Sequence, residues 1–83
     1  MAHIVIRPAE FFRRLGESKS AGYQKIVDGL LPDFIPLGRK ARGQIESRVD
    51  RIIEARALRK SEDEIRRLVA EMNAGRDLQM EAA

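Results

Sequence analysis

The segment Leu37-Gly38-Arg39-Lys40-Ala41-Arg42-Gly43 places three cations within four residues between two glycines. Apolar residues lead into it at Phe34 and Ile35, and Ile45 follows it. Strand-forming residues on both sides of a glycine-containing turn are typical of a β-hairpin. The sequence therefore predicts a short two-stranded hairpin with a basic tip.

A first helix is predicted before this hairpin, starting at Pro8. Proline suits the first helical position because its missing N–H would have no partner there. Phe11, Phe12 and Leu15 supply an apolar face, and Gly16 is the residue type that commonly follows a helix C-terminus. Residues 4–6, which are all apolar, are expected to form a short strand or an arm that packs over this helix.

A second helix is predicted next, capped by Ser18 or Ser20 and ended by Gly29 and Pro32. Its expected buried stripe comprises Tyr23, Ile26, Val27 and Leu30. Its opposite, exposed face is expected to carry Ala21, Gln24, Lys25 and Asp28. Two helices joined by a tight turn and followed by a basic hairpin are typical of a winged helix-turn-helix. The expected fold is therefore mainly α, with a two-stranded β wing and one or two C-terminal helices.

The C-terminal half is expected to be helical, with capping boxes at Ser47 with Asp50 and at Ser61 with Glu64. No Gly or Pro separates the two segments, so they form either two helices or one. The second carries an apolar stripe of Ile65, Leu68, Val69 and Met72. This stripe must pack on the chain's own core, around residues 49–53, or on a second subunit. We expect a winged helix-turn-helix domain at residues 1–60 and a helical extension with a frayed tail at 61–83.

Composition limits the class of protein. The chain has 83 residues, no cysteine and a formal net charge of +3. No apolar run approaches the roughly 20 residues that span a bilayer, so we expect no membrane partner and a cytoplasmic, nucleoid-associated protein of a bacterium. Residues 1–43 hold eight Lys or Arg against four Asp or Glu (+4), and residues 44–83 hold eight against nine (−1). This asymmetry indicates either a polyanionic partner or simply a solvated surface.

The sequence offers little for catalysis. His3 is the only histidine, and without cysteine we find no nucleophile–base pair and no metal cluster. The acidic run at residues 62–64 is expected to complement a helix dipole. We therefore expect no enzyme activity, no catalytic residue, no metal and no cofactor.

The residues favour DNA binding by the second helix and the hairpin. Gln24 can pair with adenine, Lys25 can reach guanine or phosphate, and Ala21 can touch a thymine methyl group. The N-terminus of the second helix carries Ser18, Lys19 and Ser20. Their hydroxyl and N–H groups favour binding of a DNA phosphate there, and the alternative is that the serines serve only as helix caps. At the hairpin, phosphate or minor-groove contacts are expected from Arg39, Lys40 and Arg42.

Two blocks carry a resemblance to a known family. Residues 16–29 (GESKSAGYQKIVDG) resemble the helix-turn-helix of AlpA-like proteins, and residues 37–50 (LGRKARGQIESRVD) are similar to that family's wing and following helix. The resemblance covers about residues 4–58. It places Tyr23 on or beside the recognition helix. The family usually has Trp at the position of Gln44 and an apolar residue at that of Glu17, so packing is expected to be lost at both.

The resemblance implies a small winged-helix protein related to the MerR-type DNA-binding domain. Members include excisionases, also called recombination directionality factors, and prophage regulators. The expected function is excision of a mobile element, with the protein occupying several adjacent sites on double-stranded DNA, self-associating there and assisting an integrase. The alternatives are transcriptional regulation of prophage or integrase genes and, from a different class, a protein-interaction module that uses the stripe of residues 65–72.

Overall fold

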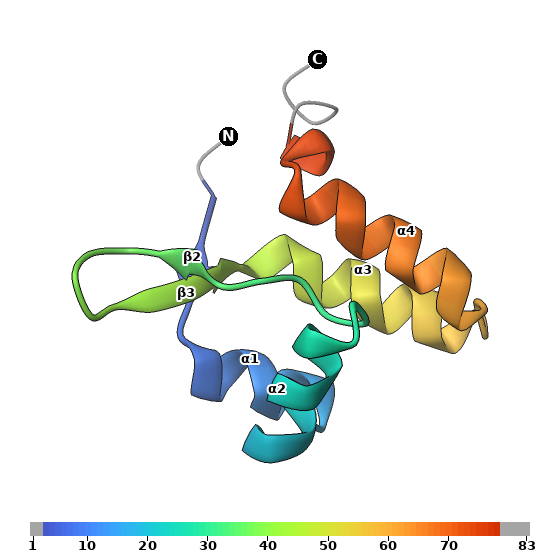
Figure 1. Ribbon diagram of the computed structural model, residues 1–83, viewed down its shortest axis with the longest axis horizontal. Coiled ribbons are helices and arrows are strands. Elements are labelled where there is room, and N and C mark those ends of the chain that lie inside the picture. Colours follow the sequence, from blue (N-terminus) through green and yellow to red (C-terminus); the bar gives the residue numbers. More distant parts are fainter. Residues whose placement is uncertain (1–2, 79–83) are drawn as a thin grey trace.

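The computed structural model describes residues 3–78, which form a mainly helical fold with a small antiparallel sheet (Figure 1). The helices are α1 (Pro8–Leu15), α2 (Lys19–Val27), α3 (Glu46–Ala57) and α4 (Glu62–Asn73). The strands are β1 (Val5–Ile6), β2 (Ile35–Pro36) and β3 (Arg42–Ile45). The loop between β2 and β3 projects beyond the helices at one side of the molecule, and the turn between α3 and α4 lies at the other.

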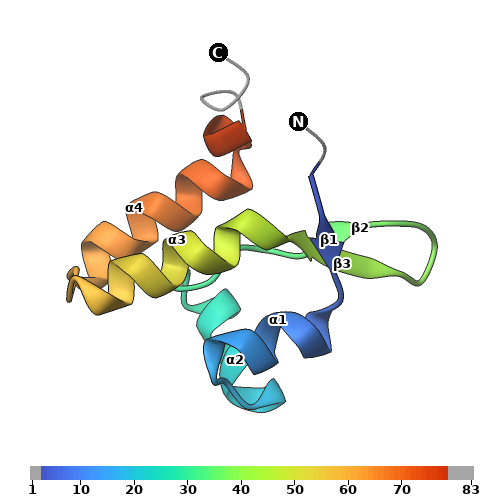
Figure 2. The same cartoon turned by 180° about the vertical axis from the view of Figure 1, so that it is seen from behind.

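The predicted hairpin is confirmed, but the sheet has three strands, because β1 pairs with the free side of β3 to give the order β1-β3-β2. The register sets Val5 opposite Ile45 and Ile35 opposite Gly43. A Cβ at Gly43 would lie within 3 Å of side-chain atoms of Val5 and Leu37. Glycine therefore lets these side chains close over the central strand. In Figure 2, β1 crosses in front of β3 and leads down to α1, which lies below the sheet.

Helix α1 follows the prediction, since it starts at Pro8 and ends at Gly16, whose φ of 71° is left-handed. Helix α2 is capped by Ser18, but its buried face differs from the expected stripe. Gly22 is buried and Val27 is 79% exposed, whereas Tyr23 lies at the edge of the core, with its ring packed against Phe12 and Phe34 (centroid distances 5.1 and 5.9 Å). The cause is the Phe12 ring, which lies directly over Gly22 and rotates α2 so that a position without a side chain faces the core.

We expect Gly22→Ala to destabilise the protein by about 1–3 kcal/mol, the usual cost of overpacking a core. An added Cβ would come within 3 Å of three carbons of the buried Phe12 ring. Gly38→Ala is the matched control, because a Cβ at Gly38 meets no atom within 4 Å. Urea unfolding of both variants measures the difference, and equal stabilities would show that the Phe12 ring yields without cost.

Helix α3 begins at Glu46 and has no side-chain cap, so the capping box predicted at Ser47 and Asp50 is wrong. Strand β3 runs directly into the helix, and the N–H of Glu46 donates to the carbonyl oxygen of Ile4 (2.8 Å). A backbone partner from the N-terminal segment thus replaces the cap. The box at Ser61 and Glu64 is confirmed at the start of α4.

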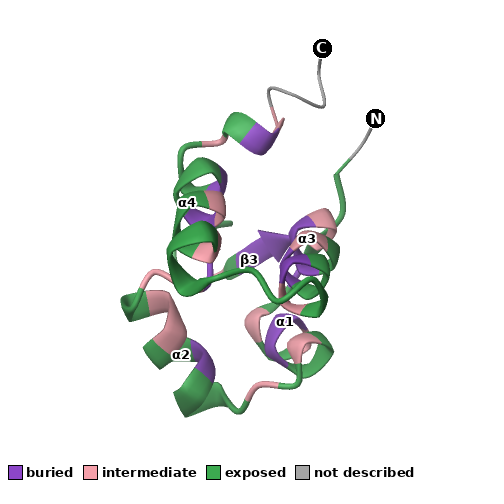
Figure 3. Ribbon diagram, turned by 90° about the vertical axis from the view of Figure 1, so that its right-hand side faces the viewer, coloured by how far each residue is buried: buried purple, intermediate pink, exposed green. Residues whose placement is uncertain are grey.

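Helices α3 and α4 are separate and share one core with α1. The turn between them includes Arg59 in a left-handed conformation, with φ of 54°. Val69 and Met72 of α4 are buried in the cluster formed by Phe11, Val49 and others, and the partly buried Ile65 and Leu68 pack against it (Figure 3). The apolar stripe of α4 therefore packs on the chain's own core. Of the predicted frayed tail, residues 76–78 form a short helical turn, and the remainder lies outside the described residues.

Candidate nucleic-acid interface

The exposed face of α2 carries most of the residues expected to bind DNA. Ser18 accepts a hydrogen bond from the backbone N–H of Ala21 (3.2 Å), which positions the hydroxyl at the helix N-terminus. Gln24 is exposed and donates through Nε2 to Asp28 Oδ1 (3.1 Å), one turn farther along. The expected residues exposed here are Ser18, Lys19, Ser20, Ala21 and Gln24.

The hairpin presents the second group. Arg39 and Lys40 lie in the exposed loop between β2 and β3, and Arg42 is exposed at the start of β3. The loop is closed by a hydrogen bond from the N–H of Leu37 to the carbonyl oxygen of Ala41 (2.8 Å). No acidic residue occurs at positions 34–45. Within residues 3–78, none of the three cations makes an ion pair.

Lys25 is the least exposed of the candidates on α2. It is partly buried and forms an ion pair with Glu17, which also accepts from Arg56 of α3 (3.0 Å). Glu17 is only 7% exposed and sits between the two cations. This arrangement ties the turn between α1 and α2 to α3, and it holds the ammonium group of Lys25 beside Glu17.

The pKa of Glu17 is set by opposing effects. Burial of the carboxylate raises it, but hydrogen bonds and charges from Lys25 and Arg56 outweigh burial and lower the pKa below its ordinary value. A carboxylate whose pKa is depressed by folding contributes stability above the pKa of the unfolded chain, about 4.3, and loses that contribution as the pH falls through its folded pKa.

We therefore expect the contribution of Glu17 to stability to be constant from neutral pH to about pH 4.3 and to be lost as the pH falls further, and Glu17→Gln to flatten part of the resulting fall. The variant loses some stability at neutral pH because its amide carries no charge for Lys25 and Arg56. Urea unfolding as a function of pH measures both curves. Glu64→Gln is the control, since the pKa of Glu64 is also lowered but its carboxylate lies on the surface, bonded to Ser61. Parallel pH curves for wild type and Glu17→Gln would remove the role assigned to Glu17.

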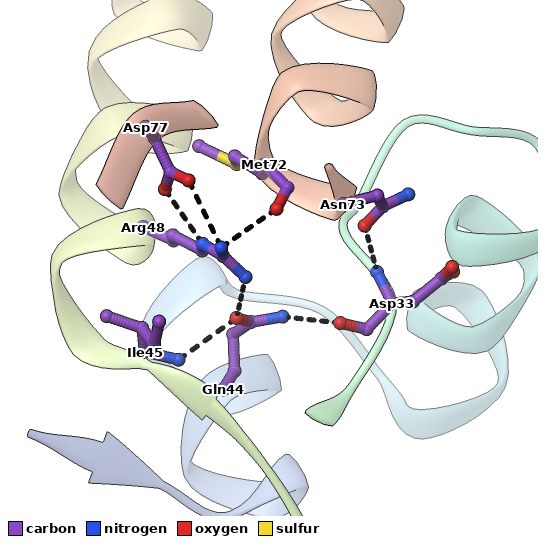
Figure 4. Close-up of polar contacts among 7 residues, drawn as sticks. All are labelled: Asp33, Gln44, Ile45, Arg48, Met72, Asn73 and Asp77. Atoms are coloured by element: carbon purple, nitrogen blue, oxygen red, sulfur yellow. Dashed lines mark hydrogen bonds and ion pairs between the residues drawn. The ribbon is translucent and has the colours of Figure 1, made fainter. Parts of the chain in front are cut away.

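A buried polar network supports the base of the hairpin (Figure 4). Gln44 of β3 is fully buried, donates to the carbonyl oxygen of Asp33 (2.9 Å) and accepts from Arg48 (2.8 Å). Arg48 also donates to both carboxylate oxygens of Asp77 (2.9 and 3.1 Å) and to the carbonyl oxygen of Met72 (2.8 Å). Gln44 and Glu17 occupy the two positions where packing was expected to be lost. Both side chains are buried and make hydrogen bonds or ion pairs, so polar contacts take the place of apolar packing there.

Sequence reasoning missed several residues of this region. Val27 had been assigned to the core, and the roles of Arg48 and Asp77 were not foreseen. The signal for the α2 error was Gly22, because a glycine in mid-helix often marks a close approach and hence the buried side. Nothing in the local sequence around Arg48 points to Asp77, which is 29 residues away.

The described residues form neither a metal-binding group nor a membrane-spanning helix. Among residues 3–78, no three His, Cys, Asp or Glu side chains are grouped so that they could hold a metal ion. None of the helices in this part of the chain has the length and apolar character needed to cross a membrane. In comparisons with known proteins, no family model, no curated protein and no solved structure matches the chain.

Proposed function

We propose that the protein binds double-stranded DNA as a winged helix-turn-helix, with α2 in the major groove and the β2–β3 hairpin as the wing. The observation that carries the proposal is the projecting hairpin loop, whose three exposed cations have no acidic residue near them in sequence. By contrast, Arg66 at the surface of α4 forms ion pairs with Glu62 (3.8 Å) and Asp63 (3.6 Å).

The geometry of α2 supports the same proposal. Its N-terminus is exposed, and a lysine and two serines are grouped there, which suits a phosphate oxygen. Its outer face holds the Gln24 amide, a group that can pair with the edge of adenine. The ion pairs of Glu17 with α2 and α3 hold this helix in a fixed orientation, which base reading requires.

The resemblance to AlpA-like proteins and excisionases extends the proposal to a biological role. In this role the protein occupies several adjacent sites, self-associates on the DNA, bends it and assists an integrase in excising a mobile element. The alternative of the same class is regulation of prophage or integrase genes. The surface that suggested a protein-interaction module, the stripe of α4, packs on the protein's own core, so we do not propose that function.

The test of DNA binding is titration of a labelled duplex of random sequence, about two helical turns long, with the full chain. We expect retention that weakens steeply between about 50 and 200 mM salt, because each neutralised phosphate releases counterions. A complex that forms at low salt and does not respond to salt, or no complex at all, would contradict the proposal. An integrase excision assay with and without the protein tests the wider role.

A further inference from the structure

Val27 is unusually exposed for an apolar residue on a helix that packs against a core. Its exposed fraction is 79%, the highest among the large hydrophobic residues in the described part of the chain. It stabilises little in the isolated protein, because its side chain remains in water. It follows Gln24 by three positions, which places the two within about 60° of each other on the outer face of α2.

Gln24 has a fixed orientation beside it. One hydrogen of Nε2 points to Asp28 Oδ1 (3.1 Å), which leaves Oε1 and the second hydrogen for a ligand. Asp28 is itself held, since its carbonyl oxygen accepts from Arg66 Nε of α4 (3.0 Å). An acceptor and a donor side by side match N6 and N7 of adenine.

The chemistry of the major groove indicates what Val27 would contact. Thymine is the base that presents a methyl group there, and apolar side chains recognise it by contact. Valine is β-branched and stiff in a helix, so it loses little freedom on binding. Val27 lies about 4.5 Å along the helix axis from Gln24, close to the roughly 3.4 Å between successive bases.

We propose that Val27 is a specificity-determining residue, which contacts the C5 methyl group of a thymine one base step from the adenine paired with Gln24. This proposal rests on the proposed function and deepens it. It differs from the expectation that Ala21 makes the thymine contact. Ala21 lies near the start of α2 and its methyl group projects less far than the isopropyl group of Val27.

The test uses a duplex selected by the full chain from a library with a randomised centre. Each thymine of the selected duplex is replaced singly by deoxyuridine, which removes only the methyl group. We expect one replacement to weaken binding by wild type about fourfold, the effect of one buried methyl group. Val27→Ala should bind both duplexes equally, at about the affinity of wild type for the deoxyuridine duplex.

Leu58→Ala is the matched control, because Leu58 is also exposed (62%) but lies at the C-terminal end of α3. It should keep the full discrimination between thymine and deoxyuridine. If no replacement affects wild type, or if Val27→Ala discriminates as wild type does, the role of Val27 is overturned and DNA binding stands. If the protein retains no duplex from the library, the proposed function fails, and this inference fails with it.

Discussion

Replacing Arg39, Lys40 and Arg42 together with alanine weakens binding to every DNA sequence and flattens its salt dependence. If each cation meets one phosphate, the slope of log affinity against log salt falls by about 3 units in magnitude, since each contact contributes about 0.9. The loss is similar for specific and random duplexes, because phosphates carry no sequence information. The measurement is affinity at several salt concentrations, with circular dichroism to show that the variant is folded.

The matched control removes three other cations, by Arg59→Ala, Lys60→Ala and Arg67→Ala. Arg59 and Lys60 lie in the turn between α3 and α4, which is at the opposite side of the molecule from the hairpin loop (Figure 1), and Arg67 lies in α4. The control changes net charge equally, so a general electrostatic attraction would lower both slopes alike. Equal slopes for the two variants, or an unchanged slope for the hairpin variant, would remove the hairpin from the interface.

The elements predicted correctly from the sequence are those specified by local rules. A basic, glycine-flanked turn between apolar residues gave the hairpin, and Pro8 and Gly16 marked the ends of α1 because their backbone preferences act within one residue. The capping box at Ser61 likewise uses contacts only three residues apart. Such signals do not depend on how the chain packs.

The orientation of α2 depends on packing, and there prediction failed. Of the expected stripe, Ile26 packs against the core but Val27 is exposed, and Gly22, which hydrophobicity does not mark, is buried instead. The Phe12 ring causes this difference by filling the space over Gly22. The same rotation moves Lys25 toward Glu17 and exposes Val27, so one packing contact changes which residues face a ligand.

The network around Arg48 could not be predicted for a different reason. Its partners come from β3, the end of α4 and the turn after it, and the separation of Arg48 from Asp77 is 29 residues. Hydrophobic patterning assigns charged residues to the surface, yet both side chains are about 96% or more buried, at 4% and 3% exposure. Only the assembled fold shows that every polar group of the network has a partner, and no buried side-chain polar atom in the described residues lacks one.

Asp77→Ala should destabilise the protein by about 3–5 kcal/mol, the usual effect of removing one member of a buried ion pair. Arg48 would keep its bonds to Gln44 and to the carbonyl oxygen of Met72 but lose the carboxylate that neutralises its charge. A domain of this size has a total stability of about 5–10 kcal/mol, so the variant should be close to unfolding at room temperature. Urea unfolding followed by circular dichroism gives the value.

Two further variants separate the buried charge from a general effect of the substitution. Asp63→Ala removes an acid whose ion pair with Arg66 (3.6 Å) is exposed, and it should cost less than about 1 kcal/mol. The double variant Arg48→Met with Asp77→Ala should be more stable than Asp77→Ala alone, because no unpaired charge remains in the core. A loss below about 1 kcal/mol for Asp77→Ala would show that Arg48 reaches water in its absence. The turn after α4 would then not be needed to hold the base of the hairpin.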